Sequence, residues 1–130
     1  MSIDKKWNIL FIKDEMSMFD LTTKMFDILF KKVDISSSKE ESLELFNSNQ
    51  YDIVIGDLSV KPEGVAFLKQ LKDIETQQTI FALVSPKDTD KLFSISDLGI
   101  NAFELIPTQF DQALEAIAEF NPYERNFGNN

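Results

Sequence analysis

Polar side chains that can carry chemistry stand at or just after the ends of four apolar runs in this sequence. In chain order they are Lys13 and Asp14, Asp57, Ser85, and Thr108. The chain has no histidine and no cysteine. This excludes Ser-His-Asp catalysis, thiol nucleophiles and metals held by imidazole or thiolate. Any chemistry must therefore use carboxylates, hydroxyls, lysine or a hard metal ion.

Each of these residues, taken singly, has an ordinary structural explanation, because an aspartate after a strand commonly forms a turn or caps a helix. Their occurrence together is more informative. Parallel strands bring their carboxyl ends to one edge of a sheet, and ligands of open α/β sheets bind beyond that edge. Two carboxylates, a hydroxyl and a lysine are therefore expected at one edge, supplied by three separate strands.

The elements that would position these residues are apolar runs of strand length that alternate with segments of helical period. The expected strands are residues 7–12, 33–36, 51–56, 79–84 and 101–106. This regular alternation predicts an α/β fold: a doubly wound parallel sheet of five strands with five helices on its two faces.

The first helix is expected over residues 16–30. One apolar stripe recurs there at helical spacing, formed by Met18, Leu21, Met25 and Ile28. A second stripe consists of Phe19, Phe26 and Phe30. It has two interpretations, packing into the core or a docking patch for a phosphodonor, and core packing is the more common use of such a stripe.

Capping and turn signals indicate the other helices. Ser38 with Glu41 three residues later forms a capping-box pattern, which predicts the start of the second helix. Asp88 or Thr89 is expected to cap the fourth helix, and Gly99 to end it. Apolar residues of the fifth recur at helical spacing: Phe110, Ala113, Leu114 and Ile117.

Length and composition fit one domain. A chain of 130 residues can bury about two-thirds of the surface that it exposes when unfolded. Apolar residues make up 43% of the chain and include 12 Phe, enough to build a core. We expect this domain to span residues 1–121, with the polar, Asn-rich residues 122–130 as a tail or the start of a linker.

The formal net charge of −9 comes from 22 acidic and 13 basic residues. Such a surface repels phosphate backbones, so nucleic-acid binding by this domain is not expected. The longest apolar runs are of strand length, and the polar N-terminus is too short for a signal peptide. We therefore expect a cytoplasmic protein that does not contact a membrane.

Four segments resemble the landmark segments of response-regulator receiver domains. They are WNILFIKDE (7–15), YDIVIGDL (51–58), ALVS (82–85) and LIPTQF (105–110). The segment that contains Asp57 is the most specific, and the resemblance covers nearly the whole chain. It implies a flavodoxin-like sheet with strand order 2-1-3-4-5. It also implies that the domain is a regulatory switch of two-component signalling and not an enzyme.

The resemblance implies a role for each polar residue. Asp57 would accept a phosphoryl group from a sensor histidine kinase or a histidine phosphotransfer protein. Mg²⁺ would be held by Asp14, Asp57 and the backbone carbonyl of Ser59, and oxygen ligands are those that this ion prefers. Ser85 would be the switch hydroxyl that hydrogen-bonds the phosphoryl oxygen. A downstream target protein would bind the last two helices and the last strand.

Two site positions depart from the family pattern. Lys13 stands where the family has the first of two adjacent acids, and Thr108 stands where it has a lysine. Replacing an acid with Lys beside a divalent cation weakens binding by on the order of 1–4 kcal/mol, so Mg²⁺ would bind weakly. Lys13 has three possible roles: a substitute cation for the missing lysine, an ion-pair partner of Asp57 that replaces the metal, or a solvated side chain.

Two functions are compatible with this resemblance and its departures. One is a phosphorylatable receiver that switches protein–protein interactions, and the other is a pseudo-receiver that binds proteins independently of phosphate. A phosphatase of the haloacid dehalogenase type is disfavoured, because Asp57 comes too late in the chain for the nucleophile of that family. A flavin carrier is disfavoured, because residues 13–15 do not form a hydroxyl- and glycine-rich phosphate loop.

Overall fold

The computed structural model describes residues 5–13, 19–57 and 63–123 of the chain. Five strands form one sheet in the order β2-β1-β3-β4-β5, and all neighbours are parallel. The strands are β1 (Asn8–Ile12), β2 (Lys32–Ser36), β3 (Ile53–Asp57), β4 (Thr79–Val84) and β5 (Asn101–Glu104). The predicted fold class and strand order are confirmed.

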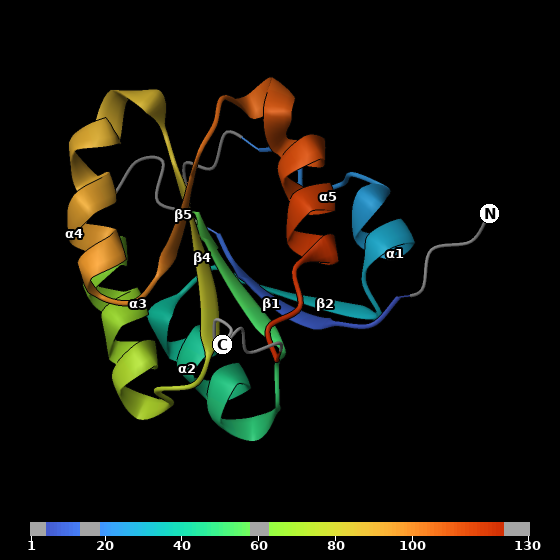
Figure 1. Ribbon diagram of the computed structural model, residues 1–130. Helices are drawn as coiled ribbons and strands as arrows, with labels where there is room; N and C mark the ends of the chain where they lie inside the picture. The colour runs from blue at the N-terminus through green and yellow to red at the C-terminus, as the bar shows by residue number, and fades with distance from the viewer. Residues whose placement is uncertain (1–4, 14–18, 58–62, 124–130) are drawn as a thin grey trace, which may run out of the picture.

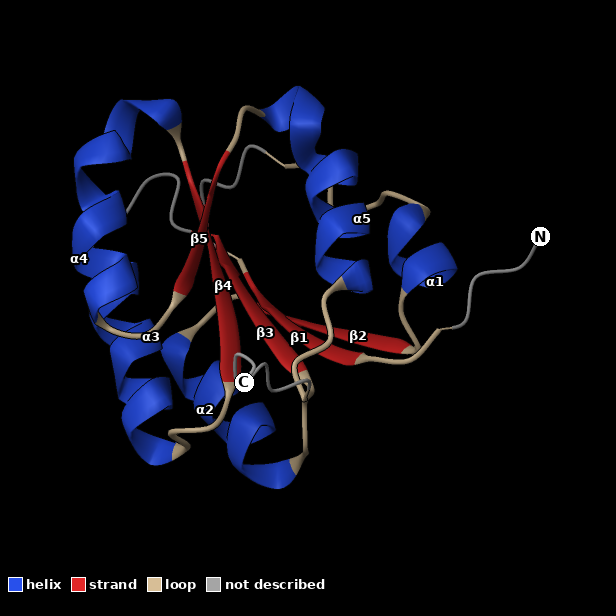
Figure 2. Ribbon diagram, viewed as in Figure 1, coloured by secondary structure: helices blue, strands red, loops and turns tan. Residues whose placement is uncertain are grey.

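Helices cover both faces of this sheet (Figures 1 and 2). They are α1 (Met25–Leu29), α2 (Lys39–Ser48), α3 (Glu63–Ile74), α4 (Leu92–Asp97) and α5 (Phe110–Glu119). Two 3-10 helices, η1 (Pro86–Lys91) and η2 (Pro107–Gln109), precede α4 and α5. Helices α1 and α5 lie on one face, and α2, α3 and α4 lie on the other (Figure 1). No helix among the described residues is long and apolar enough to cross a membrane.

The core consists of two hydrophobic clusters, one on each face of the sheet. Side chains of a strand alternate between them. In β3, Ile53 and Ile55 belong to the cluster under α1 and α5, and Val54 belongs to the cluster under α2, α3 and α4. Every residue of β3 is therefore buried, as expected for a central strand covered on both faces.

The cluster under α1 and α5 is rich in phenylalanine. Phe19 stacks on Phe110 with ring centroids 4.7 Å apart, and Phe26 meets Phe110 edge-on at 6.1 Å. Such offset and edge-on pairs add to the gain from burial alone. Phe19, Phe26 and Phe30 are all buried, so their interpretation as core residues is correct.

The predicted first helix is wrong over residues 19–24, which form a bend and turns, and α1 begins only at Met25. The cause is local hydrogen bonding that competes with a helix. Asp20 Oδ1 accepts from the backbone N–H of Thr22 at 2.9 Å and from its hydroxyl. The hydroxyl of Thr23 donates to Asp111 Oδ1 at 2.9 Å and accepts from the Met25 N–H at 3.2 Å. The Thr22 hydroxyl and then its backbone N–H lower the pKa of Asp20 below its ordinary value.

The predicted apolar stripe of that helix is correct only in part: Leu21 and Met25 are partly buried and pack against the core, but Ile28 does not. Ile28 is 45% exposed, whereas Phe26 and Leu29 on the other side of α1 are buried. Because α1 is short, its contact face consists of Phe26 and Leu29 with the partly buried Met25 beside them. Met16 and Met18 lie outside the described residues.

The start of α2 was predicted correctly. Ser38 is its N-cap, and the Ser38 hydroxyl accepts from the Glu41 N–H at 3.1 Å. Glu41 Oε1 in turn accepts from the Ser37 N–H at 3.1 Å, one residue before the cap. Gly99, predicted to end α4, has a φ of +77°, a left-handed conformation that glycine adopts without steric cost.

The predicted start of the fourth helix is wrong, because Asp88 and Thr89 lie inside η1 and α4 begins at Leu92. The helical path starts earlier, at Pro86, after Ser85 Oγ accepts from the Lys87 N–H at 3.2 Å. A proline favours the first position of a helix because its φ is already suitable and its missing N–H is not needed there.

The last strand is shorter than predicted and ends at Glu104. The Ile106 N–H donates to Gln109 Oε1 at 3.0 Å and is not used in the sheet. Pro107 then opens η2, which contains Thr108. All four predicted apolar residues of α5 are buried.

Candidate functional site

Asp57 is the last residue of the central strand β3, and it is only 4% exposed. In the sheet register it pairs with Leu83 of the neighbouring strand β4. Its position at the carboxyl edge of the sheet follows from the apolar run before it, which must be buried on both faces. The structure thus holds one carboxylate at the end of the best-buried strand.

Gly56, directly before Asp57, lets α3 pack closely against the end of β3. A Cβ atom at Gly56 would lie 2.9 Å from Leu68 Cδ1 and 3.0 Å from Leu68 Cδ2. Leu68 is fully buried on α3. Sequence reasoning missed this contact, although a glycine inside an otherwise β-branched run is a known signal of close approach.

Ser85 follows directly after β4 and is 6% exposed. Because β4 is the neighbour of β3, Ser85 and Asp57 lie at the same edge on adjacent strands. Ser85 Oγ accepts a hydrogen bond from Lys87 N–H, the bond that begins η1. A hydroxyl that accepts still has its own hydrogen to donate, so Ser85 can bind an oxygen of a ligand without losing this contact.

Lys13 follows β1, the other neighbour of β3, and is half-buried. Its backbone N–H donates to the Ser36 carbonyl of β2 at 2.8 Å, so the sheet fixes its backbone. Across the described ranges, the ion pairs are Lys32–Asp34 and Lys69–Asp73, and Lys13 takes part in neither. That Lys13 serves the site as a cation stays a prediction.

Thr108 is exposed and lies in η2, beyond the end of β5. The structure therefore brings Asp57 and Ser85 together at adjacent strand ends, with Lys13 after the strand on the other side. Thr108 belongs to the same edge but is one strand further away. Asp14 and Ser59, the other predicted metal ligands, lie outside the described residues.

The end of β2 carries a serine network that sequence reasoning did not find. Ser42 Oγ donates to the Ser38 carbonyl at 2.7 Å, and Ser36 Oγ lies 2.6 Å from Ser42 Oγ. Because the only hydrogen of Ser42 is used at Ser38, Ser36 is the donor of the second bond. Both hydroxyls are fully buried and join α2 to the edge of the sheet beside Lys13.

The carboxylate and hydroxyl at this edge are hard oxygen donors, which suit Mg²⁺ better than a softer metal. In the part of the chain that the structure describes, no three carboxylates form a cluster that could hold a metal ion.

No family model matches the sequence, and no curated protein matches it. Solved structures do match. A response regulator receiver domain protein from Clostridium thermocellum has 23% identity and a TM-score of 0.66, and the match covers 85% of this chain and 93% of that one. The response regulator TrrA from Thermotoga maritima, solved in complex with Mg²⁺-BeF, has 21% identity and a TM-score of 0.67 over 85% and 95% of the two chains.

NtrX from Brucella abortus matches 92% of this chain with 14% identity and a TM-score of 0.68. The match covers only 28% of the NtrX chain. The likeness to these proteins is one of fold: this chain has the five-stranded receiver fold of CheY-like response regulators over most of its length.

Proposed function

We propose that this domain is a receiver of a two-component phosphorelay that accepts a phosphoryl group on Asp57 and thereby switches protein–protein interactions. The observation that carries the proposal is the placement of two groups within this fold. The buried carboxylate of Asp57 ends the central strand, and the hydroxyl of Ser85 stands at the end of the adjacent strand.

The transfer needs only a nucleophile on this protein. A carboxylate oxygen of Asp57 forms a bond to phosphorus while the bond from phosphorus to the histidine nitrogen of the donor breaks. The electron pair leaves with that nitrogen. The histidine belongs to a sensor kinase or phosphotransfer protein, which agrees with a receiver chain that has none. The domain then acts as a switch and is not an enzyme.

Mg²⁺ supplies charge neutralisation at the transferring group. Asp57 would hold it together with Asp14 and the backbone carbonyl of Ser59. The hard oxygen donors of Asp57 and Ser85 fit such an ion, and a protein of the same fold has been solved with Mg²⁺-BeF. Binding is expected to be weak, because Lys13 stands beside Asp14.

The switch would run through Ser85. Its hydroxyl can donate to a phosphoryl oxygen while it still accepts from Lys87 N–H, the first bond of η1. Any shift of Ser85 toward Asp57 would therefore move η1 and, through it, α4. The surface of α4, β5 and α5 is the expected binding site for a cytoplasmic target protein.

The second candidate function is a pseudo-receiver, a module that binds proteins independently of phosphate. The observation in its favour is Thr108, which is exposed and uncharged where the family lysine would stand. Without that lysine a phosphoryl group loses a charge-assisted contact worth about 1.5–3 kcal/mol.

Acetyl phosphate with Mg²⁺, followed by intact-mass measurement, tests the proposal. We expect the wild-type chain to gain one phosphoryl group, and we expect no gain when the metal is chelated or in Asp57→Asn. Asp52→Asn is the matched control, because it makes the same change at the other end of β3. It should be modified as fast as the wild type. No gain in the wild type at saturating Mg²⁺ would favour the pseudo-receiver, and modification of Asp57→Asn would place the acceptor elsewhere.

A further inference from the structure

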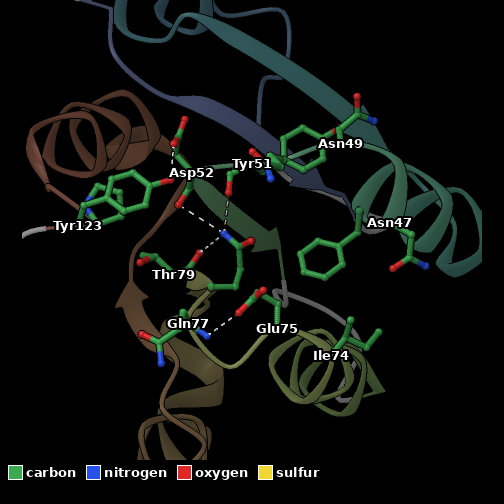
Figure 3. Close-up of a pocket in the computed structure, with 13 residues that line it drawn as sticks. Asn47, Asn49, Tyr51, Asp52, Ile74, Glu75, Gln77, Thr79 and Tyr123 are labelled. Atoms are coloured by element: carbon green, nitrogen blue, oxygen red, sulfur yellow. Dashed lines mark hydrogen bonds between the residues drawn. The ribbon is translucent and has the colours of Figure 1, made fainter.

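A cleft of about 600 Å³ lies at the amino edge of the sheet, the edge where β3 and β4 begin. Asp52 and Thr79 line it at the starts of these strands, and the C-terminal ends of α2 and α3 border it. Figure 3 shows Tyr123 at one side of this cleft and Asn47 and Ile74 at the other. The cleft is at the opposite end of β3 from Asp57, so it is a separate site.

The charged side chains that line the cleft are acids. Asp52 Oδ2 accepts from Asn8 N–H at 2.7 Å, and its Oδ1 accepts from the Tyr123 hydroxyl at 2.5 Å. Glu75 Oε1 accepts from Gln77 N–H at 3.1 Å. Each carboxylate oxygen has a second lone pair, so both acids can accept further hydrogen bonds.

The surroundings of the cleft add two helix C-termini and one lysine, Lys72. None of the described residues that line the cleft is lysine or arginine. The last turn of α2 has no basic residue, and α3 has only Lys72 there, which donates to the Gln78 carbonyl at 2.8 Å. The C-terminal end of a helix carries a partial negative charge and favours a cation.

A buried amide adds an acceptor of fixed orientation. Gln78 is 8% exposed and lines the cleft. Its Nε2 donates to the carbonyls of Tyr51, Asp52 and Thr79 at 3.1, 3.3 and 3.3 Å, shown as dashed lines in Figure 3. These three acceptors settle which end of the amide is nitrogen. Gln78 Oε1 accepts no hydrogen bond from the described residues, which leaves it for a donor in the cleft.

The remaining walls suit an alkyl chain. Ile74 is 50% exposed at the end of α3, and Phe46 and Tyr51 present aromatic surface. The Tyr51 hydroxyl is held by Asp34 at 2.6 Å, so its ring is fixed. Such walls pack against a hydrocarbon stem.

We propose that this cleft binds an alkyl guanidinium cation. The planar guanidinium has five N–H donors in a fixed fork and no acceptor. It therefore suits a cleft whose lining offers hydrogen-bond acceptors: two carboxylates and the Gln78 oxygen. An arginine side chain of a partner protein and a free small molecule share this chemistry.

The test is an NMR-detected titration of the full chain with butylguanidinium and with butylurea, its neutral isostere. Butylguanidinium should shift the Gln78 side-chain amide and the backbone amides of Asn8 and Gln77, with an affinity that falls as salt is added. Butylurea should bind at least about fivefold more weakly, the effect of one unit charge at contact distance even in water. Equal binding of the two probes would overturn the proposal.

Charge-matched variants separate a site from general attraction to an acidic protein. Asp52→Asn and Glu75→Gln should each weaken butylguanidinium binding at least about fivefold while leaving the circular dichroism spectrum unchanged. Glu115→Gln removes the same charge from the exposed face of α5, outside the cleft, and should leave affinity unchanged. Equal weakening in all three variants would overturn the proposal.

A peptide arm identifies the source of the guanidinium. Acetyl-Gly-Arg-Gly-amide carries the same group on a backbone. Tighter binding of this peptide than of butylguanidinium would assign the cleft to an arginine of a protein partner. Tighter binding of butylguanidinium would assign it to a free small molecule.

Discussion

The two ends of β3 each carry an aspartate, and the two residues are used differently. Asp52 stands just before the strand, where Asn8 N–H and the Tyr123 hydroxyl bind its two oxygens. Asp57 ends the strand and is almost fully buried. Asp52 joins three distant segments of the chain, and Asp57 places a carboxylate at the edge where open α/β sheets bind their ligands.

The direction of the chain accounts for this difference. In a βα unit the strand ends where the next helix begins, so helix N-termini gather at the carboxyl edge of the sheet. Helix C-termini gather at the amino edge, as α2 and α3 do beside the cleft. Helix N-termini favour anions such as phosphate, and C-termini favour cations. The proposed phosphoryl site and the proposed cation site therefore each lie at the end of β3 whose helix termini suit their charge.

The largest expected effect tests whether the carboxyl end of β3 binds a metal. Lys13→Asp changes the charge after β1 by two units, so it should tighten Mg²⁺ binding by at least about tenfold. Calorimetric titration of the wild type and the variant measures this directly. Equal affinities would mean that the Lys13 ammonium points to solvent, and both cation roles considered for Lys13 would fail.

Thr108→Lys is the companion variant for that experiment. It restores a cation at η2 without changing the charge after β1, so it should leave Mg²⁺ affinity nearly unchanged. It should instead prolong the phosphorylated state, by adding a charge-assisted contact to the phosphoryl oxygens. Intact-mass measurement over time follows this lifetime.

A smaller effect tests how tightly the carboxyl end is packed. Gly56→Ala would bring a methyl group to 2.9 Å from Leu68 Cδ1. Overpacking of this kind costs about 1–3 kcal/mol of unfolding free energy, measured by urea denaturation. In a Leu68→Ala background the same substitution should cost less, because the clashing atoms are gone. Additive costs would show that the contact with Leu68 is not the cause.

Most of the sheet could be predicted from sequence because its strands are continuous apolar runs. The structure has β4 at Thr79–Val84, the predicted residues, and it starts or ends the other strands within two residues of prediction. The first helix was predicted, but it was made too long at its start. Its apolar spacing fits a helix from residue 16, but Asp20 and Thr22 use their side chains for a turn, so the helix begins only at Met25.

The candidate site was predictable only in part, for a related reason. Asp57 and Ser85 were found because a strand end is visible in the sequence. The amino-edge cleft was not found, since its contacts join segments far apart in the chain. Tyr123 binds Asp52 across 71 residues, and Trp7 donates its indole N–H to the Ala118 carbonyl across 111. No local sequence pattern predicts such pairs.

The smallest effect concerns the amino end of β3. The hydrogen bond to Asp52, with some burial, raises the pKa of Tyr123 from 10.0 to about 12. Because the folded pKa is the higher one, the bond stabilises the fold fully below about pH 10, and this contribution is lost as the pH rises through about 12. Tyr123 is 64% exposed, so Tyr123→Phe should cost less than about 1 kcal/mol at neutral pH.

Two optical signals can measure this contact, because the chain has one tryptophan and two tyrosines. Trp7 lies 5.9 Å from the Tyr123 ring between centroids, so its emission reports on Tyr123. The pKa of the other tyrosine, Tyr51, is also raised, by burial and then by its bond to Asp34. We therefore expect no tyrosinate absorbance near pH 10 in the folded wild type. In the wild type, Trp7 emission should fall as Tyr123 ionises near pH 12. This fall should be absent in Tyr123→Phe. If Tyr123 of the wild type ionises at its ordinary pKa, Asp52 does not hold it. Tyr123 would then not form one side of the cleft.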